Sequence, residues 1–548
     1  MTAAASLSWL RRGLSRVAVI IPVSLGFLVA VALPASAHAV LEHSTPAADT
    51  VVRAEPAVVV LTYDETVVAA SDALHVYDDH LQAVKAGSTS HSAGQGSSIE
   101  ASLPPGLADG TYTVTWRVTS ADTHIVSGSF EFSIGHRTKV IGSPPTIRQD
   151  PATLTDSGVI RGLGYAGLVL GPGMLIVALW LWPAGLAMRR VRRTIVGGGI
   201  GLVVVTLAGF VVQGALAAGV PLAHAFRGSV LKLGVEGRFG KAGMERLALL
   251  VVLLDLFLIT RSNERRRRYA VSVAGVALAA TWPYAGHAST GSLVPLTFVA
   301  DLVHISAMAT WLGGLALLLV GVLPSATDGA REVVARFSEW ALASVTLLVV
   351  TGLFASWRNV RHWGAYTATR YGVLLLIKSG VVVVVIAVAV VSRRLVARRA
   401  AAGSMPLSRL RWSVGAEAGI AVVILAITAA LTGTAQAYEV YAPAFSQAAT
   451  DGDIVVTVHL DHTRVGSVEL VVSTRRVNGD VQKISEISGS LTEVDPPVGP
   501  LPITFHSGGV GREVASVSFP DQGSWQVQLN VQTSAINEIA VTATVPIK

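Results

Sequence analysis

Hydrophobic and polar residues follow two different patterns along this 548-residue chain. In the middle of the chain they form long apolar runs, separated by short polar or basic segments. A run of about 20 apolar residues crosses the ~30 Å hydrocarbon layer of a membrane as an α-helix. We therefore expect residues 158–436 to form an eight-helix, all-α transmembrane domain. The predicted spans lie at approximately 163–187, 194–217, 246–260, 270–286, 297–322, 338–356, 371–392 and 412–434.

The region before these spans is rich in β-forming residues. Between residues 38 and 143, β-branched and aromatic runs at 58–63, 73–77, 112–118 and 129–134 are separated by Gly, Pro and Asp turns. Short strands bounded by such turns are typical of β-sandwiches and Greek-key barrels. We expect an N-terminal all-β domain of this kind, with a Greek-key topology.

The C-terminal region, residues 437–548, is also expected to be a β-domain. Runs at 453–458, 467–472 and 525–529 alternate with the period of two that is typical of half-buried strands. A Pro-rich and polar stretch, residues 144–157, predicts a linker between the first β-domain and the helices. The expected fold is a multidomain membrane protein in which one β-sandwich precedes the transmembrane core in the sequence and another follows it.

The first 37 residues have the pattern of a secretory signal peptide. Arg11, Arg12 and Arg16 precede an apolar run, and Ala35-Ser36-Ala37 has the small residues of an A-x-A cleavage site. An uncleaved anchor helix is the alternative, but the short apolar core and the polar segment that follows favour cleavage. Cleavage after residue 37 would make His38 the first residue of the mature chain.

The distribution of charge predicts the orientation of the spans. The chain carries 42 Lys and Arg against 35 Asp and Glu, and its basic excess lies in residues 158–436, between two acidic flanks. The loops after the odd-numbered spans hold most of the loop Lys and Arg, including Arg265 to Arg268. Basic loops stay in the cytoplasm, so both β-domains should lie outside the plasma membrane. No basic face of the kind that binds nucleic acid is predicted.

Three residues of the N-terminal region form a candidate metal site. After cleavage, His38 would offer an α-amine and an imidazole, and Asp122 and His124 add a carboxylate and a second imidazole. Such N and O ligands suit tetragonal Cu(II). The alternative is that His38 is merely tolerated after the cleavage site and that Asp122 and His124 are an exposed loop pair. The chain has no Cys, which excludes disulfides and thiolate metal sites.

Two motifs in this region resemble the CopC copper-binding family. Residues 38–46, HAVLEHSTP, resemble the mature start of that family, and residues 120–130, SADTHIVSGSF, resemble its second conserved segment. Thr123 stands where Gly is usual. The resemblance implies a Greek-key sandwich that binds Cu(II) through the N-terminal amine, His38, Asp122 and His124. Residues 38–157 contain no Met, so we expect no Cu(I) site in this domain.

Ionisable residues inside a predicted span indicate a transport pathway, because they are costly in a membrane. Asp301, His304 and Met308 in the fifth span share one helix face at 3.6 residues per turn, and His287 precedes that span. Imidazole binds both copper states and thioether favours Cu(I), so these four residues are a candidate copper path. An ion pair between Asp301 and Lys378 is the structural alternative.

The helical region resembles the CopD membrane-protein family over roughly residues 160–435. The resemblance is carried by the stretches 286–288, 301–307 and 311–315. It is also carried by Phe337-Ser338, Thr351-Gly352, Tyr371-Gly372 with Lys378, and Glu417 before Leu431-Thr432. The C-terminal domain is similar to YtkA-like β-domains. Together these resemblances imply a CopC–CopD fusion that captures Cu(II) outside the cell and moves copper across the membrane, with Cu(I) as a second form in the helices.

Two other functions remain open from the sequence. One is a haem-b membrane oxidoreductase with axial ligands among His287, His304, His224 and His362. The other is a copper sensor or storage protein without transport. We expect a non-enzymatic protein that is not an ATP-driven pump, because no G-x-x-x-x-G-K-[ST] motif is present. The expected partners are copper ion, the lipid bilayer and copper chaperones outside or inside the cell.

Overall fold

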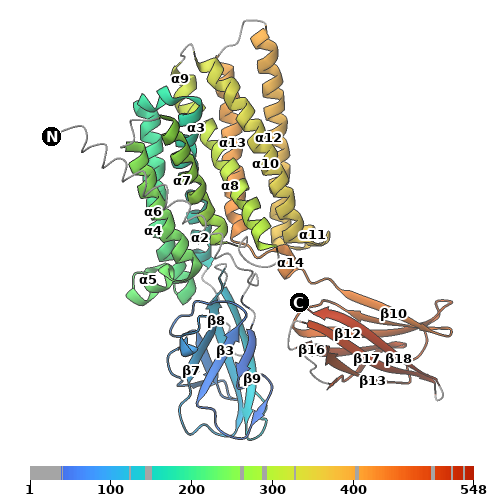
Figure 1. The fold of residues 1–548 in the computed structure, drawn as a ribbon. Helices are drawn as coiled ribbons and strands as arrows, with labels where there is room; N and C mark the ends of the chain where they lie inside the picture. The colour runs from blue at the N-terminus through green and yellow to red at the C-terminus, as the bar shows by residue number, and fades with distance from the viewer. Residues whose placement is uncertain are drawn as a thin grey trace. The chain divides into compact units, whose positions relative to one another are not determined.

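The computed structural model shows two β-rich regions and a helical middle (Figure 1). The predicted signal peptide, residues 1–37, lies outside the described residues. The structure describes residues 39, 41–121, 125–141, 151–258, 264–286, 293–325, 329–401, 407–494, 500–519, 523–534 and 537–547.

The N-terminal region is a β-sandwich, as the strand pattern predicted. One sheet has the order β1 (Leu41–Thr45), β3 (Val58–Tyr63), β7 (Ser98–Ser102), β6 (Ser90–His91). The other has the order β2 (Val51–Val52), β9 (Ile125–Ile134), β8 (Gly110–Thr119), β4 (Leu74–Tyr77), β5 (Ala83–Val84). Alternate residues of β3 are buried, and β8 is buried along its whole length. The core therefore lies between the two sheets, with β8 at its centre.

The helical middle begins earlier than the sequence predicted. Helix α2 starts at Pro151, inside the stretch expected to be a linker, and a proline is favoured in the first turn of a helix because its missing N–H has no partner there. The long helices are α2 (Pro151–Leu168), α3 (Met174–Leu181), α4 (Arg189–Ala218), α6 (Gly237–Leu258), α7 (Glu264–Tyr284), α8 (Val294–Leu317), α10 (Ala330–Val360), α12 (Arg370–Ala401) and α13 (Leu407–Thr432).

Among the described residues, six helices are long and apolar enough to cross a membrane. The predicted count of eight is therefore not confirmed. The two other predicted spans fall in α6 and α7, which are helical but more polar. Helix α6 carries Lys241, Glu245, Arg246 and Asp255, and α7 opens with several charged residues. The six spans are Thr155–Leu181, Arg189–Ala218, Val294–Ser325, Ala330–Val360, Arg370–Val391 and Arg411–Thr432.

The two most buried spans, α2–α3 and α8, pack against each other through glycines. A Cβ atom on Gly173 would lie 2.5 Å from the carbonyl oxygen of Ala309, and one on Gly313 would lie 2.6 Å from the nitrogen of Met174. Only glycine permits this approach of the two backbones. Both spans also contain one π-helical turn, at Val169–Gly173 and at Leu318–Val322.

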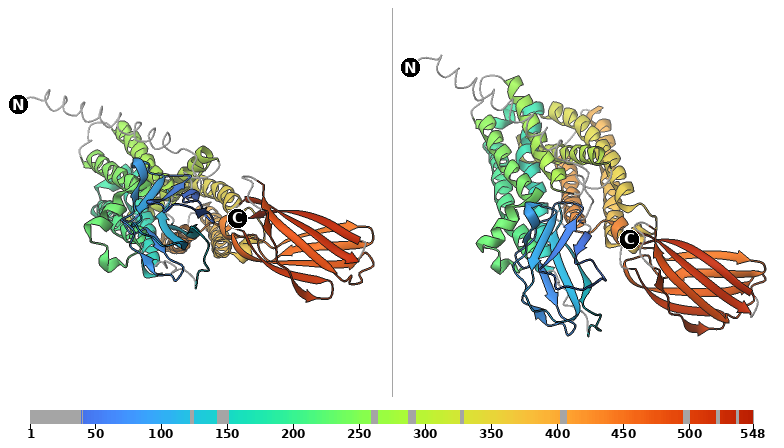
Figure 2. Two further views of the ribbon diagram at one scale, coloured as in Figure 1. Left: turned by 90° about the horizontal axis from the view of Figure 1, so that it is seen from below. Right: turned by 60° about the horizontal axis from the view of Figure 1, so that its bottom comes forward.

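The C-terminal region is a second sandwich of long antiparallel strands (red in Figure 2). Its buried side chains, such as Trp525 and Phe519, come from alternate positions along the strands. One sheet has the order β10 (Phe445–Asp451), β11 (Ile454–Leu460), β12 (Gly466–Arg476), β16 (Arg512–Phe519), β15 (His506–Gly509). The other has the order β14 (Leu501–Pro502), β13 (Glu486–Glu493), β17 (Gly523–Ser534), β18 (Asn537–Ile547).

Candidate metal sites

The three residues of the predicted N-terminal metal site, His38, Asp122 and His124, lie outside the described residues. Their neighbours are described. Ala39 is 3% exposed and belongs to the hydrophobic core of the N-terminal sandwich. Ala121 lies just after β8, the central strand of the same domain. Both halves of the predicted site are thus attached to one sandwich, while the coordination itself stays a prediction.

A buried carboxylate, Glu65, holds the segment that leads into Asp122. Glu65 is 5% exposed, and its Oε1 accepts a hydrogen bond of 3.2 Å from the backbone N–H of Ala121. Val68 and Thr119 are joined by two backbone hydrogen bonds of 2.8 Å. The connection after β3 therefore fixes the end of β8. Glu65 was not predicted from the sequence, because a buried and a solvated Glu look alike in a connecting segment.

Aromatic side chains pack behind this end of β8. Trp116 meets Tyr63 edge to face, with ring centroids 5.5 Å apart. Burial raises the pKa of the Tyr63 phenol, so Tyr63 stays neutral at physiological pH. Gly128 on β9 lies opposite Trp116 in the strand register. The glycine of the CopC-like segment thus makes room for the indole ring.

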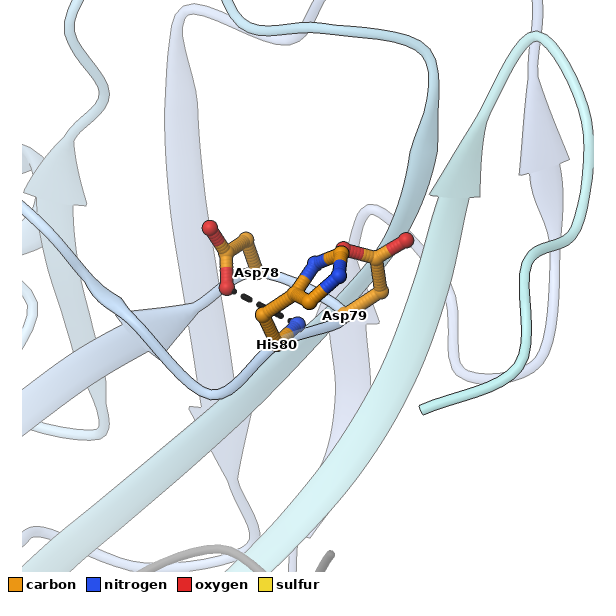
Figure 3. A group of neighbouring side chains, drawn as sticks. All are labelled: Asp78, Asp79 and His80. Atoms are coloured by element: carbon orange, nitrogen blue, oxygen red, sulfur yellow. Dashed lines mark hydrogen bonds and ion pairs between the residues drawn. The ribbon is translucent and has the colours of Figure 1, made fainter. Parts of the chain in front are cut away.

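One cluster of candidate ligands does appear among the described residues: Asp78, Asp79 and His80, in the turn between β4 and β5 (Figure 3). The Oδ1 atom of Asp78 accepts hydrogen bonds from the backbone N–H groups of His80 and Gln82, at 3.0 and 2.8 Å. Hydrogen bonds from Thr138 and His80 lower the pKa of the Asp79 carboxyl. These hydrogen bonds explain the cluster as a stabilised turn, and no metal site was predicted there from the sequence.

In the helical region, Asp301, His304 and Met308 lie on the continuous helix α8, as their spacing predicted. Steps of three and four residues place them on one helix face. Asp301 and His304 are half-buried, and Met308 is buried in the core of the helical region. His287, the other residue of the predicted path, lies outside the described residues.

Two groups from other helices act on this face of α8. The Oγ1 atom of Thr351, on α10, lies 2.8 Å from Nδ1 of His304. Lys378, on α12, interacts electrostatically with both Asp301 and His304. Opposite charges therefore attract across α8 and α12, while the close Asp301–Lys378 ion pair stays a prediction. The contact of Thr351 with His304 was not predicted from the sequence, because a threonine in an apolar helix commonly forms a hydrogen bond only with its own backbone.

Three family models match separate parts of the chain. The CopC domain matches residues 41–135, the copper resistance protein D-like N-terminal domain matches residues 157–294, and copper resistance protein D matches residues 331–431. The first match covers the N-terminal sandwich. The other two cover much of the helical region, including α2 to α7 and α10 to α13.

Individual proteins are similar to this chain either over nearly its whole length or over its N-terminal domain alone. The chain is 25% identical over 543 residues to the copper transport protein CutJ of Bacillus subtilis, covering 94% of this chain and 97% of that protein. It is 31% identical over 98 residues to protein YobA of Escherichia coli, covering 18% of this chain and 79% of YobA. The crystal structure of CopC from Methylosinus trichosporium OB3b is 30% identical and covers 19% of this chain and 100% of that chain, with a TM-score of 0.17.

Proposed function

Because this chain belongs to the CopC–CopD family of copper resistance proteins, we propose that it captures Cu(II) outside the cell and moves copper inward across the plasma membrane. The observation that carries the proposal is the union of a CopC sandwich and a CopD helical region in one chain. A binding domain attached to a membrane region delivers its ligand at a high effective concentration. We assign no catalytic activity to the protein.

Capture depends on the start of the mature chain. His38 would supply an amine and an imidazole, and Asp122 and His124 would supply the other ligands, a set that favours Cu(II) among divalent ions. The buried carboxylate of Glu65 supports this assignment, because it holds Ala121 in place beside Asp122.

Movement through the membrane depends on α8. The imidazole of His304 binds either copper state, and the thioether of Met308, which lies one helical turn deeper, favours Cu(I). Asp301 offers a carboxylate on the same face, and His287 would precede it at the outer end. Copper would therefore enter at the outer half of α8 and then move inward to the sulfur atom of Met308.

The proposal is tested by uptake of radioactive copper into cells or proteoliposomes that contain the full chain. His304→Ala should abolish uptake and leave Cu(II) binding by the N-terminal domain intact. His224→Ala is the matched control, since His224 is an exposed histidine in the turn after α4. Uptake at the wild-type rate in His304→Ala, at equal expression, would refute the proposed path. A strong haem absorbance band in the purified protein would instead favour an oxidoreductase.

The proposed orientation is tested by thiol labelling, because the chain has no Cys of its own. Single cysteines replace Ser404, between α12 and α13, and Ser490, in the C-terminal domain. A membrane-impermeant thiol reagent should label position 490 in intact cells and leave position 404 unlabelled until the cells are opened. The reverse pattern would place the two acidic β-domains inside.

A further inference from the structure

The hydroxyl of Thr351 makes two short contacts that together fix the position of its proton. Its Oγ1 lies 2.6 Å from the carbonyl oxygen of Leu347, one turn earlier on α10, and 2.8 Å from Nδ1 of His304 on α8. A carbonyl oxygen can only accept a hydrogen bond. The hydroxyl proton must therefore point to Leu347, since two oxygens at 2.6 Å without a proton between them would repel each other.

Because Thr351 donates its hydroxyl proton to the carbonyl of Leu347, its oxygen can only accept a hydrogen bond from His304. The proton of that hydrogen bond consequently sits on Nδ1 of the imidazole. A neutral imidazole has one protonated and one unprotonated nitrogen. A histidine that binds a metal is neutral, so only one of its two ring nitrogens carries a proton. His304 is thus the Nδ1–H tautomer, and its lone pair lies on Nε2.

The imidazole ring of His304 packs against the backbone of α10. Gly352 follows Thr351, and a Cβ atom at that position would lie 3.8 Å from Cε1 of His304. The ring therefore lies against the helix surface beside the threonine that holds it. Thr346 makes the same bond to the preceding turn, at 2.9 Å to Leu342, but it is exposed. A hydrogen bond from a threonine to the preceding turn is thus not special to Thr351 on this helix. What distinguishes Thr351 is its additional contact with a histidine.

We propose that Thr351 is a positioning residue that holds His304 in the Nδ1–H tautomer and so presents Nε2 as the copper ligand. This inference rests on the proposed function, since it names the ligand atom of the same path. Metal-binding histidines generally donate their second ring N–H to an oxygen acceptor, and loss of that acceptor costs about 10- to 100-fold in metal affinity or activity. In most such sites the acceptor is a carboxylate, carbonyl or water, and here it is a hydroxyl whose own proton is already committed.

The first test is copper uptake by the full chain. Thr351→Val keeps the shape of the side chain and removes the acceptor, so uptake should fall about 10- to 100-fold. Thr351→Ser retains a hydroxyl and should restore most of the activity. Thr346→Val is the matched control and should transport at the wild-type rate. Wild-type uptake in Thr351→Val would overturn the inference.

The second test does not depend on transport. Nitrogen-15 NMR of the copper-free full chain, with the His304 signals assigned by their loss in His304→Gln, reports which ring nitrogen carries the proton. Wild-type and Thr351→Ser should show a proton on Nδ1, and Thr351→Val should show a mixture of tautomers. A proton on Nε2 in the wild type would overturn the inference. If instead His304→Ala transports normally, the proposed path fails and Nε2 is not a copper ligand, whereas the NMR result still decides whether Thr351 sets the tautomer of His304.

Discussion

Gly128 of β9 lies directly opposite Trp116 of β8, and the indole ring occupies the space that a side chain at position 128 would need. A Cβ atom there would lie 2.5 Å from Cζ2 and 2.9 Å from Cε2 of Trp116. The ring cannot easily move, because it is 6% exposed and packs against Tyr63. Glycine is therefore required by packing at this position.

Gly128→Ala should destabilise the N-terminal domain by about 1–3 kcal/mol, the usual cost of forcing an extra methyl group into a packed site. The free energy of unfolding can be measured by denaturant titration of residues 38–143. Ser127→Ala, at the exposed neighbouring position, serves as the control and should change stability little. Equal stability of Gly128→Ala and the wild type would show that the strand pair can open at no cost.

Replacing Glu65 should weaken Cu(II) binding without changing any proposed ligand. Glu65→Ala removes the acceptor for the part-buried Ala121 N–H, so the chain just after β8 should be held less firmly. We expect affinity to fall about 10-fold or more, measured by competition with a Cu(II) chelator. Glu65→Gln keeps an oxygen acceptor and should have a smaller effect. Glu42→Ala, at an exposed site, is the control, and an equal loss in that variant would argue against a specific role for Glu65.

Cu(II) capture should require the free amine of His38. The domain comprising residues 38–143, produced with its native start, should bind one Cu(II) with a nitrogen-rich tetragonal signal in electron paramagnetic resonance. An extra Met before His38 converts the amine into an amide and removes one end of the chelate. That protein, and His124→Ala, should bind far more weakly, and acid should weaken the native site by protonating its ligands. An unchanged spectrum and affinity in the Met-extended protein would rule out the amine as a ligand.

The thioether of Met308 should matter only if Cu(I) is the transported form. Met308→Leu conserves volume at a buried position, so its effect on stability should stay below about 1.5 kcal/mol. Copper uptake under reducing conditions should nevertheless fall, because the soft ligand is lost. Met244→Leu is the matched control, since Met244 is 57% exposed on α6. Equal uptake in the two variants would assign Met308 to packing.

The elements that the sequence predicted are those with a strong local pattern. The run at 58–63 coincides with β3, and the alternating run at 467–472 lies within β12. The placement of Asp301, His304 and Met308 on one helix also followed from spacing alone. The start of α2 inside the expected linker was not predicted, because Pro151 and the polar residues after it have the composition of a loop.

The missed site residues have a different origin. Glu65 is a candidate because its buried side chain accepts a hydrogen bond from Ala121, which lies far from it in sequence. Thr351 is a candidate because another helix brings His304 to its hydroxyl. Neither residue differs locally from an ordinary polar side chain in a connection or an apolar helix. Their roles arise only from tertiary contacts, and no periodicity records those contacts.

The π-helical turn at Leu318–Val322 changes how α8 should be compared with its relatives. A π-helical turn closes its hydrogen bonds over five residues instead of four, so it holds one residue more than the α-helical turns around it. Beyond it, the angular position of every side chain is offset by about 100°, the rotation per residue of an α-helix. Only Leu323–Ser325 follow the turn within this span, so a relative without it would align with a one-residue gap near the end of the span and keep the face with His304 unchanged. Such a gap would mark a rotated helix end and leave the relation of Asp301, His304 and Met308 as it is.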